Sequence, residues 1–198
     1  MPLIILFLAA LLLLGPQIWA RHVIAKHSKD RDDLPGTGGE LAKHLLTTSG
    51  FDGYSVQIDT LSRGDHFDPL NRTIVLKPNH YEKRSLSAAV VAAHEFGHAI
   101  QLQIGYRPLL LRSRLVVAAA AAERLASVLL LMTPVVSLVA KTPVAGVGVL
   151  AFGIVIMTLP ILVHLVTLPV EFDASFNRAL PILRKGYLGA SDLKDAKT

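Results

Sequence analysis

Residues 90–101 read VVAAHEFGHAIQ, in which two histidines, His94 and His98, are separated by three residues. The surrounding run, about residues 87–104, is rich in alanine and free of proline, so we expect a helix here. Residues four apart on a helix face the same way, and the ring nitrogens of the two histidines can therefore meet one metal ion. Glu95 is rotated away from that ion and can reach a water molecule beside it. The alternative is an apolar helix whose two histidines are satisfied by hydrogen bonds.

The composition is that of a chain partly inserted in a membrane. Of 198 residues, 52% are hydrophobic and 18% are charged, which is little charge for the large surface of one small soluble domain. The net charge of +5 comes without a strongly basic run or interleaved aromatic residues, so we expect no nucleic-acid partner. Because the chain has no cysteine, disulfides and thiol catalysis are excluded, and any metal must be held by His, Asp or Glu.

Three apolar runs are candidates for membrane spans. Residues 2–20 carry no charge and are followed by basic residues, which favours an uncleaved anchor with its N-terminus outside; a cleaved signal peptide is the alternative. Two further runs, about residues 115–140 and 144–170, are separated by a turn at KTP and predict a helical hairpin. Basic residues flank both outer ends of the hairpin, which places these ends in the cytoplasm: Arg107, Arg112, Arg114, Arg178, Arg184 and Lys185.

A catalytic zinc needs a third protein ligand besides the two histidines. Because the predicted hairpin crosses the membrane twice, the chain returns to the side on which it started. The first acidic residue after that return is Glu171, which makes it the preferred third ligand. Glu123 is the other acidic residue between the motif and this point, and it lies at the membrane boundary. The alternative for Glu171 is a carboxylate that begins a helix at the membrane interface.

The segment between the first two spans, residues 21–114, is polar enough to be soluble. Thr37 and Glu40 form the pattern of a capping box, which predicts that a helix begins there. Residues 54–61 alternate between apolar and polar types and predict a strand, and a turn leads to a second strand at 73–76. We therefore expect a mainly α protein with a small β-sheet, of the α+β class.

Four motifs together resemble a known family. AAHEFGHAIQ is preceded by GDHFDP and followed by YRPLLLR and LPVEFDAS. In this order they resemble the bacterial neutral zinc metallopeptidases of the membrane, the YugP-like group, over most of residues 36–185. The fold of that group is thought similar to the HtpX and CAAX-prenyl protease zincins. The resemblance implies Zn²⁺ bound by His94, His98 and Glu171, with Glu95 catalytic, in a bacterial inner membrane.

The chain departs from the HtpX-like pattern at one position. Those enzymes typically have an aspartate four residues after the glutamate ligand, where Ser175 stands here. No residue is therefore assigned as the carboxylate that would orient a ligand histidine. The candidates are Asp173, Asp65 and Asp68. Arg178 is a candidate for stabilising the oxyanion, although contact with lipid headgroups is the alternative.

These observations predict an integral membrane, zincin-like protein with about three transmembrane helices. Its expected parts are an anchor (1–20), a cytoplasmic zincin-like segment with the motif helix (21–114), a transmembrane hairpin (115–170) and a C-terminal helix that carries the third ligand (171–198).

The expected activity is that of a gluzincin-like endopeptidase, in which zinc activates a water molecule and Glu95 acts as general base. The partners would be a protein or peptide substrate, extended beside the strand in NRTIVL, and the lipid bilayer. The enzyme would be a multi-pass protein of the inner membrane with its active site facing the cytoplasm.

Two other functions are compatible with the motif. A site-2-type intramembrane protease also carries H-E-x-x-H, but here the motif helix is too short and polar to span a bilayer, and no later LDG sequence appears. A non-catalytic membrane scaffold with a retained metal site is the second alternative. Structural zinc usually has four protein ligands, whereas three are evident here, and Glu95 would then have no role.

Overall fold

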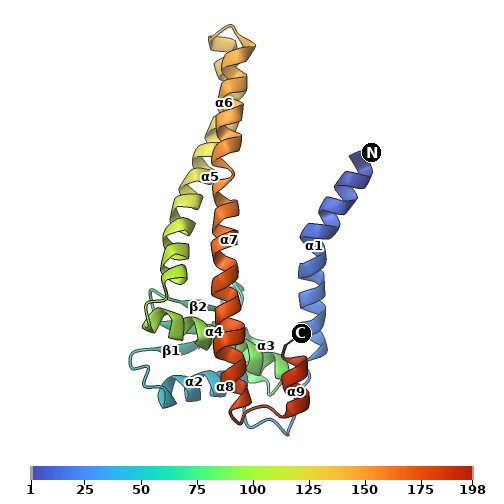
Figure 1. Cartoon of the computed structure of the whole chain (residues 1–198), viewed down its shortest axis with the longest axis vertical. Helices are drawn as coiled ribbons and strands as arrows, with labels where there is room; N and C mark the ends of the chain where they lie inside the picture. The colour runs from blue at the N-terminus through green and yellow to red at the C-terminus, as the bar shows by residue number, and fades with distance from the viewer. Residues whose placement is uncertain (1, 198) are drawn as a thin grey trace. The chain divides into compact units, whose positions relative to one another are not determined.

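The computed structural model describes residues 2–197, except for the side chains of residues 2, 3, 5–13 and 161. The outermost residues of the predicted first and last segments, Met1 and Thr198, lie outside this description, as do most side chains of the predicted anchor. The chain forms two compact units, one made of residues up to 100 together with those from 174 onward, the other of residues 101–173. Figure 1 follows the course of the chain through its helices and strands.

The first unit holds the small sheet and the motif helix. Its elements are α1 (Pro2–Lys26), α2 (Gly38–Thr48), β1 (Ser55–Ile58), β2 (His66–Asp68), β3 (Thr73–Leu76), α3 (Pro78–Glu82), most of α4 (Leu86–Gln103), the π-helical turn η1 (Asp173–Ala179), α8 (Leu180–Arg184) and α9 (Ala190–Asp195). The expected class, mainly helical with a small sheet, is confirmed.

Helix α2 begins and ends as local sequence signals dictate. The Thr37 hydroxyl accepts a hydrogen bond from the Glu40 N–H at 3.1 Å, and the Glu40 carboxylate accepts one from the Thr37 N–H at 2.8 Å, so the predicted capping box is confirmed. At the other end Gly50 has φ +70, a left-handed conformation that glycine adopts without strain. The Phe51 N–H then bonds to the Leu46 carbonyl at 3.0 Å and closes the helix.

The sheet has three strands in the order β1-β3-β2. β1 runs parallel to β3, and β2 runs antiparallel to it. The strands predicted within residues 54–61 and at 73–76 are confirmed, but β2 lies where only a turn was expected. Three residues are too few to show an alternating pattern, which is why the sequence did not reveal it. Because β3 is the central strand, the expectation that a substrate pairs with its edge is wrong: the outer strands are β1 and β2.

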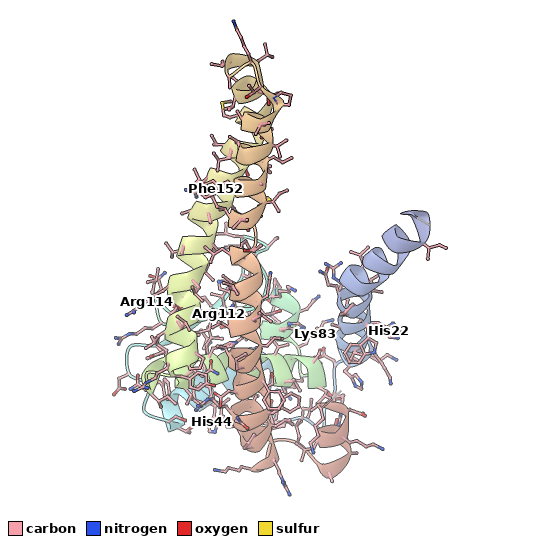
Figure 2. The ribbon with its side chains drawn as sticks, turned by 45° about the horizontal axis from the view of Figure 1, so that its top comes forward. His22, His44, Lys83, Arg112, Arg114 and Phe152 are labelled. Atoms are coloured by element: carbon pink, nitrogen blue, oxygen red, sulfur yellow. The ribbon has the colours of Figure 1, made fainter. Side chains whose placement is uncertain are left out.

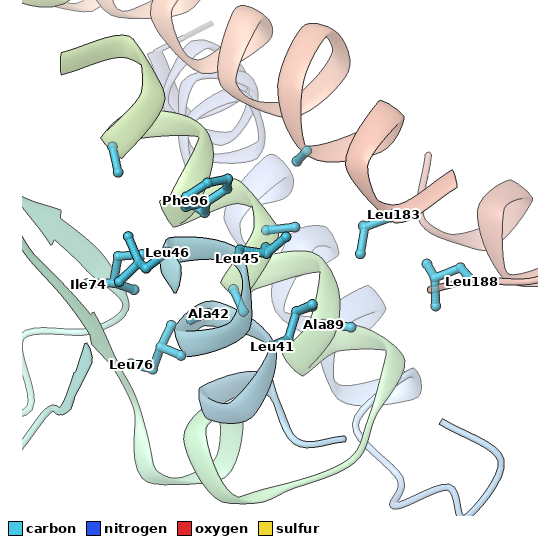
Figure 3. Close-up of a cluster of buried hydrophobic side chains, with 14 of the residues drawn as sticks. Leu41, Ala42, Leu45, Leu46, Ile74, Leu76, Ala89, Phe96, Leu183 and Leu188 are labelled. Atoms are coloured by element: carbon cyan, nitrogen blue, oxygen red, sulfur yellow. The ribbon is translucent and has the colours of Figure 1, made fainter. Parts of the chain in front are cut away.

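The core of this unit lies between α2, the sheet and one face of α4 (Figure 3). Leucines of α2 pack against Ile74 and Leu76 of β3, which are both fully buried. From α4, Ala89, Ala93 and Phe96 enter the same cluster, at the spacing of three and four residues that defines one helix face. The opposite face of α4 is thereby left for the polar residues of the motif.

The second unit contains a helical hairpin. α5 (Arg107–Val139) packs against both α6 (Pro143–Ile156) and α7 (Leu159–Phe172), and the chain turns at Lys141, which has φ +53. The predicted hairpin and its turn at KTP are therefore confirmed. The apolar run at 144–170 is not one helix, however, since it is interrupted between α6 and α7. Pro160 supplies no N–H and its ring clashes with the carbonyl four residues earlier, so the first helix ends before it.

Within the described residues, α5 is the helix that is long and apolar enough to cross a membrane. It has 33 residues, with Arg112 and Arg114 near its start, whereas Phe152 lies on the shorter apolar helix α6 (Figure 2). The apolar helix α6 has 14 residues and is shorter than a span requires. The expectation of three spans therefore stays a prediction.

Candidate metal centre

The motif lies on α4, as predicted, and the start of this helix is fixed by a serine cap. The Ser85 hydroxyl accepts a hydrogen bond from the Ala88 N–H at 3.2 Å. Along the helix, His94, His98 and Gln101 follow one another at intervals of four and three residues and share a face. That face is opposite to the one through which Phe96 enters the core. The local amphipathic pattern thus decides which way both histidines point.

The two histidine rings approach as ligands of one ion would. Their Nε2 atoms lie 3.1 Å apart, and their ring planes are nearly perpendicular, at 84°. Two nitrogens that each lie 2.0–2.1 Å from a tetrahedral zinc would be separated by about 3.3 Å. The His94 Nδ1 is 2.9 Å from the Ser175 hydroxyl. When this nitrogen carries the ring proton and donates it to Ser175, Nε2 presents its lone pair.

Glu171 completes the group. His94, His98 and Glu171 each offer one ligand atom, and these atoms all lie within 4.8 Å of one another. Two imidazoles and one carboxylate are a common ligand set of catalytic zinc, which keeps its fourth position open. The three residues can therefore hold a metal ion. Glu123, the alternative acidic residue, belongs to α5 and is not part of this group.

Several contacts hold α4 against the segment that carries Glu171 and Ser175. A Cβ added at Gly97 would lie 2.7 Å from the Ala174 carbonyl oxygen, so only glycine permits this close approach. One turn further along α4, the fully buried Gln101 donates to the Val170 carbonyl at 2.8 Å and to the Asp173 carboxylate at 2.9 Å. These contacts fix the helix register on both sides of the histidines.

The segment after Glu171 is not α-helical. α7 passes directly into η1, a seven-residue π-turn of the kind that recurs at functional sites. Pro169 has no N–H to donate to the preceding turn, which loosens the α-helical ladder just before this point. Arg178, the residue predicted as a candidate for stabilising the oxyanion, would share a face with Glu171 on a continuous α-helix, and the wider π-turn removes that register. The structure instead places Arg112 beside Glu171, with Arg112 Nη1 3.5 Å from Glu171 Oε1.

Ser175 is the residue that orients His94, one of the two proposed ligand histidines. Among the carboxylates considered from the sequence, Asp173 accepts a hydrogen bond from Gln101, Asp68 caps a turn at Leu70 and Asn71, and Asp65 pairs with His80, which is not one of the proposed ligands. The sequence did carry a signal, because Ser175 stands four residues after Glu171. Its orienting role was not predicted, because a hydroxyl stands there in place of the expected carboxylate.

A cavity of about 630 Å³ opens beside the histidines. Its wall includes His94, Glu95 and Ser175 on one side and Asp65 and His80 on another. Ligand sites commonly enclose about 300–1,000 Å³. The Glu95 side chain is largely buried, with 6% of the residue exposed, and it lines this cavity.

Comparison with known proteins identifies the family. The family model described as "Putative neutral zinc metallopeptidase" matches residues 2–198. The chain belongs to this family. It is also 32% identical over 182 residues to "Putative membrane protease YugP" of Bacillus subtilis (strain 168), an alignment that covers 88% of this chain and 76% of that protein. No solved structure matches the chain. The resemblance inferred from the four motifs is confirmed, and zinc is the metal expected for the histidine and glutamate group of this metallopeptidase family.

Ser175→Ala is expected to weaken zinc binding to this protein by about tenfold, the lower end of the range for partners of ligand histidines. The substitution removes the acceptor that holds His94 Nδ1 at 2.9 Å, so the ring can rotate and change tautomer. Competition with a fluorescent zinc chelator measures the affinity. Ser127→Ala is the control, because the Ser127 hydroxyl bonds to the Glu123 carbonyl within its own helix. Unchanged affinity in Ser175→Ala would contradict the role given to this hydroxyl.

Proposed function

We propose that this protein is a membrane-embedded zinc endopeptidase that hydrolyses peptide bonds with Glu95 as general base. One observation carries the proposal: His94 and His98 present their Nε2 atoms 3.1 Å apart while the neighbouring Glu95 lines a cavity. Glu171 belongs to the same group of ligand atoms, so the proposed site has three protein ligands. A structural zinc site is usually closed by four protein ligands and needs no adjacent carboxylate in a cavity.

In the proposed reaction zinc, when bound, supplies a Lewis acid that lowers the pKa of water and polarises the carbonyl. Glu95 accepts one proton from the attacking water as the new carbon–oxygen bond forms. It later delivers that proton to the amide nitrogen as the carbon–nitrogen bond breaks. Burial of Glu95 supports this role, because the carboxylate is held in a restricted position beside the reacting groups. His94 keeps its orientation through Ser175 during both steps.

The substrate in this proposal is a protein or peptide that lies extended in the cavity. β2 is an outer strand of the sheet, and Asp65, directly before it, lines the cavity together with Glu95. An extended peptide can add to the free edge of such a strand through main-chain hydrogen bonds. We therefore assign the peptide-pairing edge to β2 in place of β3.

We place the protein in the inner membrane, as a multi-pass protein whose active site faces the cytoplasm. The apolar helix α5 supports membrane insertion, and the relative from Bacillus subtilis is named as a membrane protease. Basic residues stand before α5 and after α7, at the two outer ends of the hairpin, whereas its turn holds one lysine, Lys141. This distribution follows the positive-inside rule. The lipid bilayer is accordingly the second partner that we propose.

Metal removal tests the proposal. Detergent-purified protein is expected to contain about one zinc per chain, the number that one three-ligand site holds, and to cleave fluorescently labelled β-casein. Incubation with 1,10-phenanthroline should abolish cleavage, and added zinc should restore it, with circular dichroism recording that the fold persists. Cleavage that survives complete metal removal would contradict a zinc mechanism. Folded, zinc-loaded protein that cleaves neither casein nor a peptide library would instead favour the non-catalytic scaffold.

A further inference from the structure

The cavity contains a second polar cluster that the proposed reaction has not used. Asp65 directly precedes β2, Lys77 directly precedes α3, and His80 lies within α3. All three line the cavity that Glu95 and His94 also line. His80, in the middle of α3, is buried, with 7% of the residue exposed. A buried ring that lines the same cavity as the proposed catalytic carboxylate requires an explanation of its own.

Asp65 fixes the orientation of the His80 ring. The His80 Nδ1 lies 2.9 Å from the Asp65 carboxylate, which also accepts the Lys77 backbone N–H at 2.7 Å. Burial raises the pKa of the Asp65 carboxyl, but hydrogen bonds from His80 and from the Lys77 N–H outweigh it and leave the pKa below its ordinary value. The carboxylate therefore stays ionised and can stabilise a positive charge on the ring.

The other ring nitrogen of His80 faces the cavity. Among the described residues, every fully buried side-chain nitrogen or oxygen has a hydrogen-bond partner. Within that same set, the hydrogen bond of the His80 side chain is the one that Nδ1 makes to Asp65. Since Nε2 makes none, it must be reached by solvent, and the cavity is the space that His80 lines. Nε2 is thus a solvent-reached donor or acceptor on an oriented ring, and the ring lines the cavity that the proposed substrate would occupy.

We propose that His80, positioned by Asp65, is a catalytic residue that donates a hydrogen bond from Nε2 to the carbonyl oxygen of the scissile peptide. This inference rests on the proposed endopeptidase function. As water attacks, Glu95 takes one of its protons and negative charge develops on the carbonyl oxygen. In this step the ring donates from Nδ1 to Asp65 and from Nε2 to that oxygen, so the proposal requires its doubly protonated form, and the second hydrogen bond shortens as the charge develops. Asp65 balances the positive charge, as a carboxylate paired with histidine does in other hydrolases.

His80→Gln tests the catalytic role. A glutamine amide can still donate to Asp65 but has no second nitrogen on the cavity side, so Asp65 is not left unpaired. We expect kcat for β-casein to fall about 10²–10³-fold, the usual effect of losing one oxyanion donor, with KM and zinc content unchanged. Asp65→Asn should lower kcat by a smaller factor, because it misorients the ring without removing it. His44→Gln makes the same chemical change at an exposed residue of α2 that does not line the cavity, and should behave as the wild type.

A binding measurement separates this role from a structural one. N-phosphoryl-leucyl-leucine, whose tetrahedral phosphoryl oxygens imitate the charged oxygen of the reaction, should bind zinc-loaded His80→Gln at least tenfold more weakly than wild type. The thermal midpoint of the two proteins should agree. Wild-type kcat in folded His80→Gln, or a joint loss of zinc, fold and activity, would overturn the inference while casein cleavage by the wild type upholds the proposed function. Zinc-loaded wild type that cleaves no casein would overturn both.

Discussion

Glu95→Gln is expected to lower kcat for β-casein by about 10³-fold, within the range that general acid–base catalysis contributes. Glutamine has nearly the same shape as glutamate but cannot accept a proton from water at neutral pH. The substitution therefore removes the proton transfer and little else. Initial rates over a range of casein concentrations measure the effect, with zinc content and the thermal midpoint recorded on the same preparation.

Zinc retention decides what a loss of activity in Glu95→Gln means. In the proposed arrangement Glu95 is not a ligand, since the group that can hold the ion consists of His94, His98 and Glu171. About one zinc per chain should thus remain in the variant, as in any site whose three protein ligands are intact. Glu123→Gln is the matched control, because it makes the same chemical change on α5, outside that group. If Glu95→Gln cleaved casein at the wild-type rate, Glu95 would not be the general base.

Local signals were sufficient to predict the elements that carry the site. The capping box at Thr37 and Glu40, the strand at 73–76 and the helix around His94 and His98 each depend on neighbours within a few residues. Glu171 was predicted from topology. Two predicted membrane crossings bring the chain back to the side of the histidines, a prediction that needs only the number of apolar runs. Even the interruption of the third run at Pro160 does not alter that count.

Local sequence patterns do not predict contacts between residues that are far apart in the chain. Ser175 and His94 are 81 positions apart, and the bond between Gln101 and Asp173 joins residues 72 positions apart. The π-turn after Glu171 combines a local cause, the missing N–H of Pro169, with these long-range partners. β2 was missed because it has three residues, and with it the pairing of Asp65 to His80. The residues that surround the proposed ligands were therefore the least predictable part of the site.

Glu171→Ala is expected to weaken zinc binding by more than about 100-fold, because loss of a direct ligand exceeds the cost of losing a residue that only orients one. The two histidines alone would leave two open positions on the ion. Arg112, which lies 3.5 Å from Glu171 Oε1, would then place an unbalanced positive charge close to the site and oppose the metal further. Zinc per chain after dialysis, together with chelator competition, measures the loss.

The zinc content of Arg112→Gln helps to decide whether Glu171 is a metal ligand or only the ion-pair partner of Arg112. If Glu171 binds the metal, Arg112→Gln should leave about one zinc per chain, since three ligands remain. If Glu171 only forms an ion pair with Arg112, Glu171→Ala and Glu123→Ala would contain the same amount of zinc per chain. A different third ligand would then be required. The chain between the motif and Glu171 offers Glu123 alone as another acidic residue. Equal zinc in all three variants would therefore remove the carboxylate from the proposed ligand set and undermine the gluzincin-like mechanism itself.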